Sequence, residues 1–395
     1  MLKIASAAFA KFAASEQAGS LLLIASALIA LLLANSTIAS SWAAFWHTPL
    51  GGLALEAWVN DLLMAVFFLL IGLELARELR VGELSDRARA LLPAVAALGG
   101  MLVPAAIHAT FNVGQPTARG FGIPMATDIA FALGVLTALG PRIPLALRVF
   151  VVAFAVIDDL GAIVVIALFY SDALAWPWVA AAVITWCALF ALNRLGRLTA
   201  LAPYLLGGAL LWLFTLKSGV HATLAGVALA FAIPSASASA SASVPSARRH
   251  AAAASDRLET MLHAPVAFVI LPIFALANAG VRIDAGSFAS LASAHGLGVL
   301  VGLVLGKPIG ILLFAGLATA LGWSRLPAGL GWRHLTGAGL LGGIGFTMAI
   351  FIANLAFPAS PEHVATSKLA ILVASTTSAL LGAAWLLAPA RRAGG

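Results

Sequence analysis

Two adjacent carboxylates, Asp158 and Asp159, lie at the centre of an apolar stretch, RVFVVAFAVIDDLGAIVVIALFY, that runs from Arg148 to Tyr170. An ionisable group at the depth of a bilayer costs at least ~2.5–3.5 kcal/mol on insertion scales. Two neighbouring carboxylates also repel each other. Such a pair persists only where it faces something other than lipid, so it indicates an ion or proton site.

Two further ionisable residues fall near the middle of apolar stretches. Asp128 follows Thr127 in GIPMATDIAFALG, and Lys307 lies in GLVLGKPIGILLF. If all four groups are ionised their formal charge is −2, which is costly in a low dielectric. Bound cations or bound protons both remove that charge, so a site that accepts either can exchange them.

The helical geometry limits how these groups are shared. Adjacent residues on a helix point about 100° apart, so Asp158 and Asp159 cannot both face one partner. We expect one carboxylate to pair with Lys307 and the other to face Asp128 and a water-filled cavity. Carboxylates are oxygen ligands suited to small hard cations, and Thr127 can add a hydroxyl. The alternative is a purely structural ion-pair network, but three acids and one base do not neutralise one another.

The chain that must position these residues is strongly apolar. Its 395 residues are 62% hydrophobic and 9% charged, whereas soluble proteins carry about 25% charged residues. Apolar runs near 20 residues recur throughout, and each can cross ~30 Å of hydrocarbon. The sequence predicts one all-α polytopic membrane domain over residues 1–395 with twelve spans, at about 19–34, 60–77, 91–108, 119–140, 146–169, 176–193, 201–216, 219–234, 264–281, 295–320, 336–357 and 367–388.

The basic residues predict the topology. With a cytoplasmic N-terminus, 17 of the 22 Lys and Arg residues fall on the cytoplasmic side and four on the outer side, with Lys307 inside a span. The positive-inside rule then predicts that both termini are cytoplasmic. The net charge of +7 follows from this topology, so we expect a lipid bilayer and no nucleic acid as a partner.

Two predicted spans are interrupted. Pro124 stands four residues before Asp128 and removes a backbone hydrogen bond. The later span, 336–357, carries three glycines near its middle, at Gly342, Gly343 and Gly345. Broken spans in corresponding places of two halves indicate a transporter site at the interface of two repeats. A Ser/Ala-rich segment at about 235–256 is predicted to be a flexible cytoplasmic linker between the halves.

These residues belong to motifs that resemble the NhaA family of bacterial sodium/proton antiporters. The resemblance covers nearly the whole chain and rests on NDLLMAVFFLLIGLELARELR (60–80), PMATDIAFALGVL (124–136), VIDDLGAIVVIALFY (156–170), SGVHATLAGV (218–227), LPIFALANAGV (271–281), GKPIGI (306–311) and GGIGFTMAIFIANLAF (342–357). It implies inverted-topology repeats, with the two broken helices crossing at mid-membrane next to Asp128 and Thr127.

The resemblance also implies the roles of the charged residues. Asp159 is then a Na⁺ ligand together with Asp128, and Asp158 is the partner of Lys307. The implied activity is the export of one Na⁺ or Li⁺ for more than one H⁺, which is electrogenic and serves Na⁺ and pH homeostasis. The protein is then a transporter of the bacterial inner membrane, not an enzyme, and it needs no cofactor.

A cytoplasmic cluster switches the family on at alkaline pH. The matching residues are Glu74, Arg77, Glu78, Glu259 and His263, and ordinary interfacial ion pairing is the alternative reading. The chain has Thr260 and Ala76 where the family can have His and Lys. A homodimer is left open, because the outer loop 35–59 is shorter than in well-known members, in which a β-hairpin supports a dimer.

Four other functions compete with a Na⁺/H⁺ antiporter. An intramembrane aspartyl protease also uses carboxylates in the membrane, but its YD and GxGD motifs do not match this chain and it has no use for Lys307. A cation channel would gain acidic rings by oligomerisation. A sodium-coupled symporter would need a wider substrate pocket. Another cation/proton exchanger would differ in the cation that it transports.

Overall fold

The computed structural model of the protein describes residues 2–171, 174–195, 200–234 and 246–388. The chain divides into two compact units. Unit 1 comprises Met1–Leu21, Leu91–Ala162 and Ile283–Gly395, and unit 2 comprises Leu22–Ala90 and Ile163–Arg282. Within the described residues, the regular structure of both units is helical apart from one short hairpin in unit 2.

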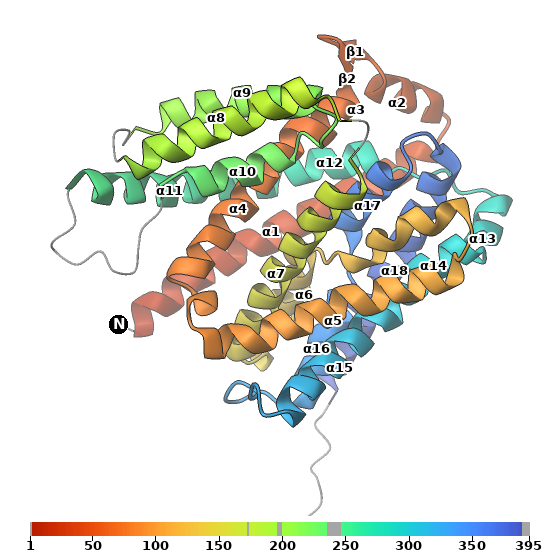
Figure 1. The fold of residues 1–395 in the computed structure, drawn as a ribbon. Helices are drawn as coiled ribbons and strands as arrows, with labels where there is room; N and C mark the ends of the chain where they lie inside the picture. Colours follow the sequence, from red (N-terminus) through yellow and green to blue (C-terminus); the bar gives the residue numbers. More distant parts are fainter. Residues whose placement is uncertain (1, 172–173, 196–199, 235–245, 389–395) are drawn as a thin grey trace, which may run out of the picture. The chain divides into compact units, whose positions relative to one another are not determined.

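Unit 1 is built from the first part of α1 (Leu2–Ala34) and from helices of the middle and the end of the chain (Figure 1). Its elements are most of α5 (Arg87–Phe111), the 3-10 helix η3 (Pro116–Met125), α6 (Ile129–Ala138), η4 (Gly140–Arg142), the larger part of α7 (Leu145–Phe169), α13 (Ala285–Leu291), α14 (Ala294–Val301), the π-helix η6 (Gly302–Gly306), α15 (Lys307–Ala320), α16 (Trp332–Gly342), α17 (Phe346–Ala356) and α18 (Pro361–Leu387).

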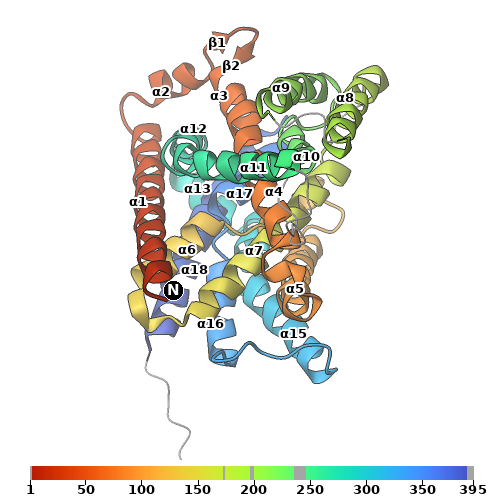
Figure 2. The same cartoon turned by 90° about the vertical axis from the view of Figure 1, so that its left-hand side faces the viewer.

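Unit 2 holds the other helices and the hairpin (Figure 2). Its elements are the end of α1 (Leu2–Ala34), α2 (Ala39–Trp46), β1 (Pro49–Leu50), β2 (Leu53–Ala54), α3 (Leu55–Trp58), the π-helix η1 (Val59–Leu63), α4 (Met64–Arg80), η2 (Glu83–Ser85), α8 (Trp176–Arg194), α9 (Ala202–Lys217), α10 (Leu224–Ala232), α11 (Ser246–Pro265), the π-helix η5 (Val266–Ile270) and α12 (Leu271–Asn278).

The prediction of a polytopic all-α membrane protein is confirmed. Within the described residues, eight helices are long and apolar enough to cross a membrane, or up to ten if each of two bent pairs counts as one span. Three of the eight, Leu55–Arg80, Ser255–Asn278 and Ala294–Ala320, contain the π-helical segments η1, η5 and η6. The two bent pairs, η3 with α6 and α16 with α17, coincide with the two interrupted spans of the sequence.

One of the twelve predicted spans is a shorter helix in the structure. The segment 201–216 corresponds to α9 (Ala202–Lys217), whose 16 residues match the predicted length. The segment 219–234 corresponds to α10, which has nine residues, because the chain turns first at Gly219. The φ of Gly219 is +82°, a left-handed conformation that interrupts a helix and suits glycine.

The structure describes only the second part of the predicted linker at 235–256. Residues 235–245 lie outside the described residues, so their flexibility stays a prediction. From Ser246 onward the chain is the helix α11, and the predicted linker is therefore helical in its second part. Alanine has the highest helix propensity, which explains why the alanine-rich sequence after Ser246 is helical.

The loop at residues 35–59 contains a small antiparallel hairpin. Strands β1 and β2 pair with Pro49 opposite Ala54 and Leu50 opposite Leu53. Gly51 and Gly52 form the turn with φ values of +61° and +92°, which is the conformation that a two-residue hairpin turn requires. The aromatic side chains of α2, Trp42, Phe45 and Trp46, contact one another in the same loop.

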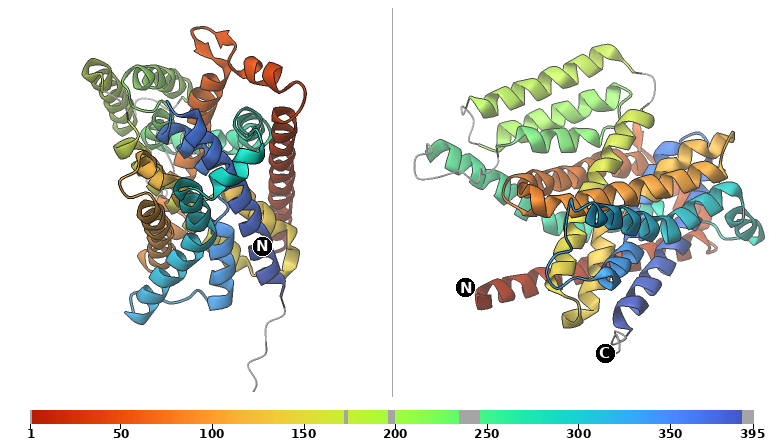
Figure 3. Two further views of the ribbon diagram at one scale, coloured as in Figure 1. Left: turned by 90° about the vertical axis from the view of Figure 1, so that its right-hand side faces the viewer. Right: turned by 60° about the horizontal axis from the view of Figure 1, so that its bottom comes forward.

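The core of unit 1 is the helix α17. Nine of its residues are buried, including Phe346, Thr347 and Phe351, and a helix that is apolar on all sides belongs inside a bundle. It packs against η3 and α18, and α16 packs against both α15 and α18 (Figure 3). In unit 2, α10 packs against α4, α8 and α9. The broken helices of unit 1 are therefore held by buried packing.

Candidate functional site

Lys307 and Asp158 form a fully buried ion pair in unit 1. The Nζ atom of Lys307 donates to both carboxylate oxygens of Asp158 at 2.8 Å, and neither side chain is exposed. Asp158 comes from the middle of α7, and Lys307 is the first residue of α15, directly after η6. The ring of Phe154 lies 5.6 Å from Nζ. A π-helical segment next to such a residue is typical of functional positions.

The carboxylate of Asp128 accepts hydrogen bonds at the N-terminal ends of two helices. Asp128 is the N-cap of α6, where its Oδ1 accepts from the backbone N–H of Phe131 at 3.0 Å. Its Oδ2 accepts from the backbone N–H of Thr347 at 3.1 Å and from the Thr347 hydroxyl at 2.5 Å, in the first turn of α17. Helix N-termini carry partial positive charge and unpaired N–H groups. Asp128 is thus a negative charge stabilised by two helix ends.

The two broken helices are joined where each is interrupted. The Thr127 hydroxyl donates to the carbonyl of Gly342 at 2.8 Å. The backbone N–H of Asp128 donates to the carbonyl of Ile344 at 2.6 Å. Those two carbonyls belong to the C-terminal end of α16 and to the connection that follows it, so the first break satisfies backbone groups of the second.

Both bends fall at residues that interrupt a regular helix. The helix pairs bend by 40° and 45° at their breaks. Pro124 lies in η3, just before the first break, and the connection at the second break begins at Gly343 and ends at Gly345. Proline removes a backbone donor, and glycine weakens a helix, so these residue types favour a break at these points.

Asp159 is buried beside the Lys307 pair, with 1% of its surface exposed. Asp159 lies close enough to Lys307 for an electrostatic attraction between the two side chains. The neighbouring Asp158 accepts a hydrogen bond from the backbone N–H of Thr127. Unit 1 therefore contains all five residues predicted from the sequence for ion and proton binding. With every carboxylate ionised the group carries two negative charges beyond the Lys307 pair, and a cation or protons can neutralise them.

Sequence reasoning missed Thr347. Its backbone N–H and its hydroxyl both donate to Asp128, which lies 219 residues earlier in the chain. The preceding N–H, that of Phe346, donates to the Ser375 hydroxyl at 3.1 Å. The only signal in the sequence is the position of Thr347 just after Gly345, where a broken helix begins again and its N–H groups need acceptors.

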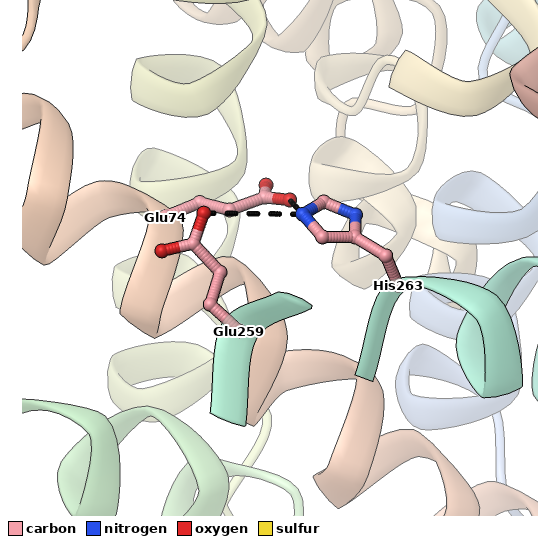
Figure 4. Close-up of side chains that lie close together, drawn as sticks. All are labelled: Glu74, Glu259 and His263. Atoms are coloured by element: carbon pink, nitrogen blue, oxygen red, sulfur yellow. Dashed lines mark ion pairs between the residues drawn. The ribbon is translucent and has the colours of Figure 1, made fainter. Parts of the chain in front are cut away.

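The five residues predicted as a pH-sensing cluster lie together in unit 2. Glu74, Arg77 and Glu78 come from α4, and Glu259 and His263 come from α11. The Nε2 atom of His263 lies 3.4 Å from Glu74 Oε1 and 3.8 Å from Glu259 Oε1 (Figure 4). Arg77 contacts Glu259 at 3.2 Å and Glu78 at 3.6 Å. The structure brings these five residues together, and their sensing role stays a prediction.

The comparisons with known proteins all indicate the same family. The model of the family described as Na⁺/H⁺ antiporter 1 matches residues 10–386. The Na⁺/H⁺ antiporter NhaA of Dechloromonas aromatica is 53% identical over 378 residues, which cover 96% of this chain and 95% of that protein. The Na⁺/H⁺ antiporter NhaA of Cytophaga hutchinsonii is 50% identical over 380 residues, covering 96% and 94%.

A third relative, the Na⁺/H⁺ antiporter NhaA of Vibrio cholerae, is 48% identical over 369 residues, which cover 93% of this chain and 94% of that protein. All three relatives are named as transporters rather than enzymes, and none is named as a protease. The multiple apolar helices agree with a multi-pass bacterial membrane protein. The chain belongs to the Na⁺/H⁺ antiporter 1 family, whose members are secondary transporters.

Proposed function

We propose that this protein exports Na⁺ or Li⁺ in exchange for more than one H⁺. The observation that carries the proposal is the group of three buried carboxylates in unit 1 with a single lysine as counter-charge. Because these charges do not cancel, the group is stabilised either by a cation or by protons. Binding of one then displaces the other, which is the requirement for exchange.

In this proposal Asp159 and Asp128 bind the transported Na⁺. Both side chains are buried, at 1% and 2% exposure, so a cation between them replaces water with carboxylate oxygens. Thr127 is a further oxygen ligand, because its hydroxyl proton points to Gly342 and the oxygen lone pairs stay available. Lys307 and Asp158 form the adjacent pair that gives up or takes up protons, and the carboxylates titrate as a coupled set.

We also propose that exchange is electrogenic and regulated by pH. Moving more than one H⁺ against one Na⁺ transfers net charge, so the membrane potential contributes to the driving force. The cluster of Glu74, Glu78, Glu259 and His263 with Arg77 is the proposed sensor. It combines carboxylates, a guanidinium and a histidine within ion-pair distance, and histidine is the side chain that changes charge nearest neutrality.

The proposed location is the bacterial inner membrane, with both termini in the cytoplasm. The excess of Lys and Arg in alternate connections supports this orientation. A homodimer is part of the same proposal, and the hairpin of β1 and β2 is the element that would contribute to it. Cross-linking of the protein in membranes tests the dimer.

The experiment uses purified protein in liposomes with an imposed pH gradient. Addition of Na⁺ or Li⁺ should dissipate the gradient at a pH near 8, a value implied by the family resemblance, and K⁺ should not. Clamping the membrane potential with K⁺ and valinomycin at different values should change the rate. A rate that ignores the potential contradicts electrogenic exchange, and an equal response to K⁺ contradicts the ion assignment. A sodium-coupled symporter would leave the pH gradient intact.

A further inference from the structure

Three side chains of unit 2 have the composition of a transition-metal site. Glu74, Glu259 and His263 each offer one ligand atom, and these atoms all lie within 4.8 Å of one another (Figure 4). This is the one group of three or more His, Cys, Asp or Glu side chains with that spacing among the residues that the structure describes. The three come from two packed helices, α4 and α11, so the backbone fixes their positions.

The distances fit a small metal ion. Ligand bonds of about 2.0–2.1 Å in a tetrahedral zinc site place neighbouring ligand atoms about 3.3 Å apart. The Nε2 atom of His263 lies 3.4 Å from Glu74 Oε1 and 3.8 Å from Glu259 Oε1. Small side-chain rotations therefore bring all three atoms to one ion, and a water molecule can take the fourth position.

The burial of the three side chains is graded. Glu259 is 7% exposed, Glu74 21% and His263 36%. Glu259 is thus the most buried of the three ligands, and Glu74 and His263 are partly exposed. Glu259 and His263 are one helical turn apart on α11, which places them on the same face.

The charge favours a divalent cation. Two ionised carboxylates with a neutral histidine carry −2, and Arg77 contacts Glu259 at 3.2 Å and offsets part of that charge. Glu78 contacts Arg77 in turn, at 3.6 Å. A metal ion at the cluster competes with Arg77 for Glu259. The single imidazole selects Zn²⁺ or Co²⁺ over Ca²⁺ and Mg²⁺, which prefer six or more oxygen ligands.

We propose that Glu74, Glu259 and His263 form a binding site for Zn²⁺ or a similar transition-metal ion in unit 2. The proposal does not depend on ion exchange, because binding is measured directly. The first test is titration of the full-length protein, purified without a polyhistidine tag and treated with a chelator, with Zn²⁺ by isothermal titration calorimetry. Wild type should bind one Zn²⁺ per chain and should bind Ca²⁺ and Mg²⁺ far more weakly. Absence of Zn²⁺ binding, or equal binding of Ca²⁺, overturns the proposal.

The second test assigns the ligands. His263→Ala should weaken Zn²⁺ binding by roughly tenfold or more, because one of three ligands is lost. His263→Cys should restore it, since a thiolate also binds zinc, and Arg77→Gln should strengthen it by removing the competitor. The matched control is His47→Ala, because His47 also lies 3.7 Å from a carboxylate, that of Glu56. If His263→Ala binds as wild type does, or if His47→Ala weakens binding equally, the site is not the cluster.

A third readout does not require any variant. Co²⁺ in a tetrahedral protein site absorbs strongly in the visible range, whereas Co²⁺ in water absorbs weakly. Wild type loaded with Co²⁺ should show this absorption, and Zn²⁺ should abolish it by displacement. A weak, octahedral-type spectrum contradicts the proposed geometry even if the variants fail to fold.

Discussion

The ammonium group of Lys307 bonds both oxygens of Asp158 at 2.8 Å, and the two side chains are completely buried. This pair leaves Asp128 and Asp159 as the buried carboxylates of unit 1 whose charge Lys307 does not pair with, and a cation can neutralise them. It also fixes α15 against α7, because each residue compensates the charge of the other where water cannot. In the proposed mechanism, stability and proton exchange therefore depend on the same two residues.

Replacing Lys307 with methionine should destabilise the protein. Removing one partner leaves a buried carboxylate uncompensated, which costs about 3–5 kcal/mol. Asp158→Asn should also destabilise, whereas the double variant Asp158→Asn, Lys307→Met should recover much of the loss, since both charges are gone. Thermal unfolding of the purified protein in detergent measures the effect. If the losses of the two single variants simply add in the double variant, the residues are not coupled.

Thr347→Val should weaken the apparent affinity for Na⁺. The variant removes the hydroxyl that donates to Asp128 at 2.5 Å, so ionised Asp128 loses a charge-assisted hydrogen bond, and about tenfold more Na⁺ is needed for half-maximal exchange. Thr347→Ser retains the donor and should behave as wild type. Thr215→Val is a control, because that hydroxyl bonds Leu211 of its own helix. Equal effects of Thr347→Val and Thr347→Ser would refute the role of the hydroxyl.

Gly310→Ala should destabilise unit 1. A Cβ atom at Gly310 would collide with the backbone carbonyl of Gly99, because α15 and α5 approach each other closely at this point. Overpacking of this kind costs about 1–3 kcal/mol. Gly316→Ala lies on the same helix, and its nearest contact would be Trp332 at 3.8 Å, so it should be harmless. Melting temperatures compare the two, and equal values would contradict the close helix contact.

Ser367→Ala should disturb a buried chain of hydrogen bonds in unit 1. The Ser367 hydroxyl donates to the carbonyl of His363 at 2.7 Å, so it accepts from His295 Nε2, also at 2.7 Å. The Nδ1 atom of His295 is then an acceptor for His108 Nε2–H at 3.1 Å. The donor and the acceptor of each of these hydrogen bonds are therefore fixed, and both histidines are neutral.

Without the Ser367 hydroxyl, the buried N–H of His295 loses its acceptor, at a cost of roughly 1–3 kcal/mol. Ser378→Ala is the matched control on the same helix, because Ser378 is equally buried and its hydroxyl has no hydrogen-bond partner among the described residues. Thermal unfolding should separate the two variants. A melting temperature unchanged by Ser367→Ala would show that the chain of hydrogen bonds contributes nothing to stability.

Hydropathy is sufficient to predict the helical membrane fold, and Pro124 with the glycines at 342, 343 and 345 predicts the positions of both breaks. Hydropathy overestimates the segment 219–234, because an apolar composition does not reveal that Gly219 adopts a positive φ and delays the helix to Leu224. The composition of the segment after Ser246 predicts a linker, although the helix propensity of its alanines favours α11 there.

The candidate site was predictable for its charged residues but not for all of its neutral ones. Charges such as Asp158 and Lys307 are conspicuous in apolar sequence, since they are rare at membrane depth. Thr347 is not conspicuous, and its contact with Asp128 arises from the crossing of two helices that are distant in the chain. The resemblance to a known family implied the pairing of Lys307 with Asp158, which spacing alone left open.

Na⁺/H⁺ exchange by the variant Asp159→Asn most directly tests the central claim, which is that Asp159 binds the transported Na⁺. The measurement uses everted vesicles or proteoliposomes with an imposed pH gradient, to which Na⁺ is added near pH 8, a value implied by the family resemblance. The control is Asp86→Asn, because Asp86 is an exposed carboxylate that contacts Arg89 at 3.6 Å. We predict that wild type and Asp86→Asn dissipate the gradient and that Asp159→Asn does not, while its thermal stability shows that it is folded. Dissipation by Asp159→Asn at the wild-type rate and Na⁺ concentration would contradict the account.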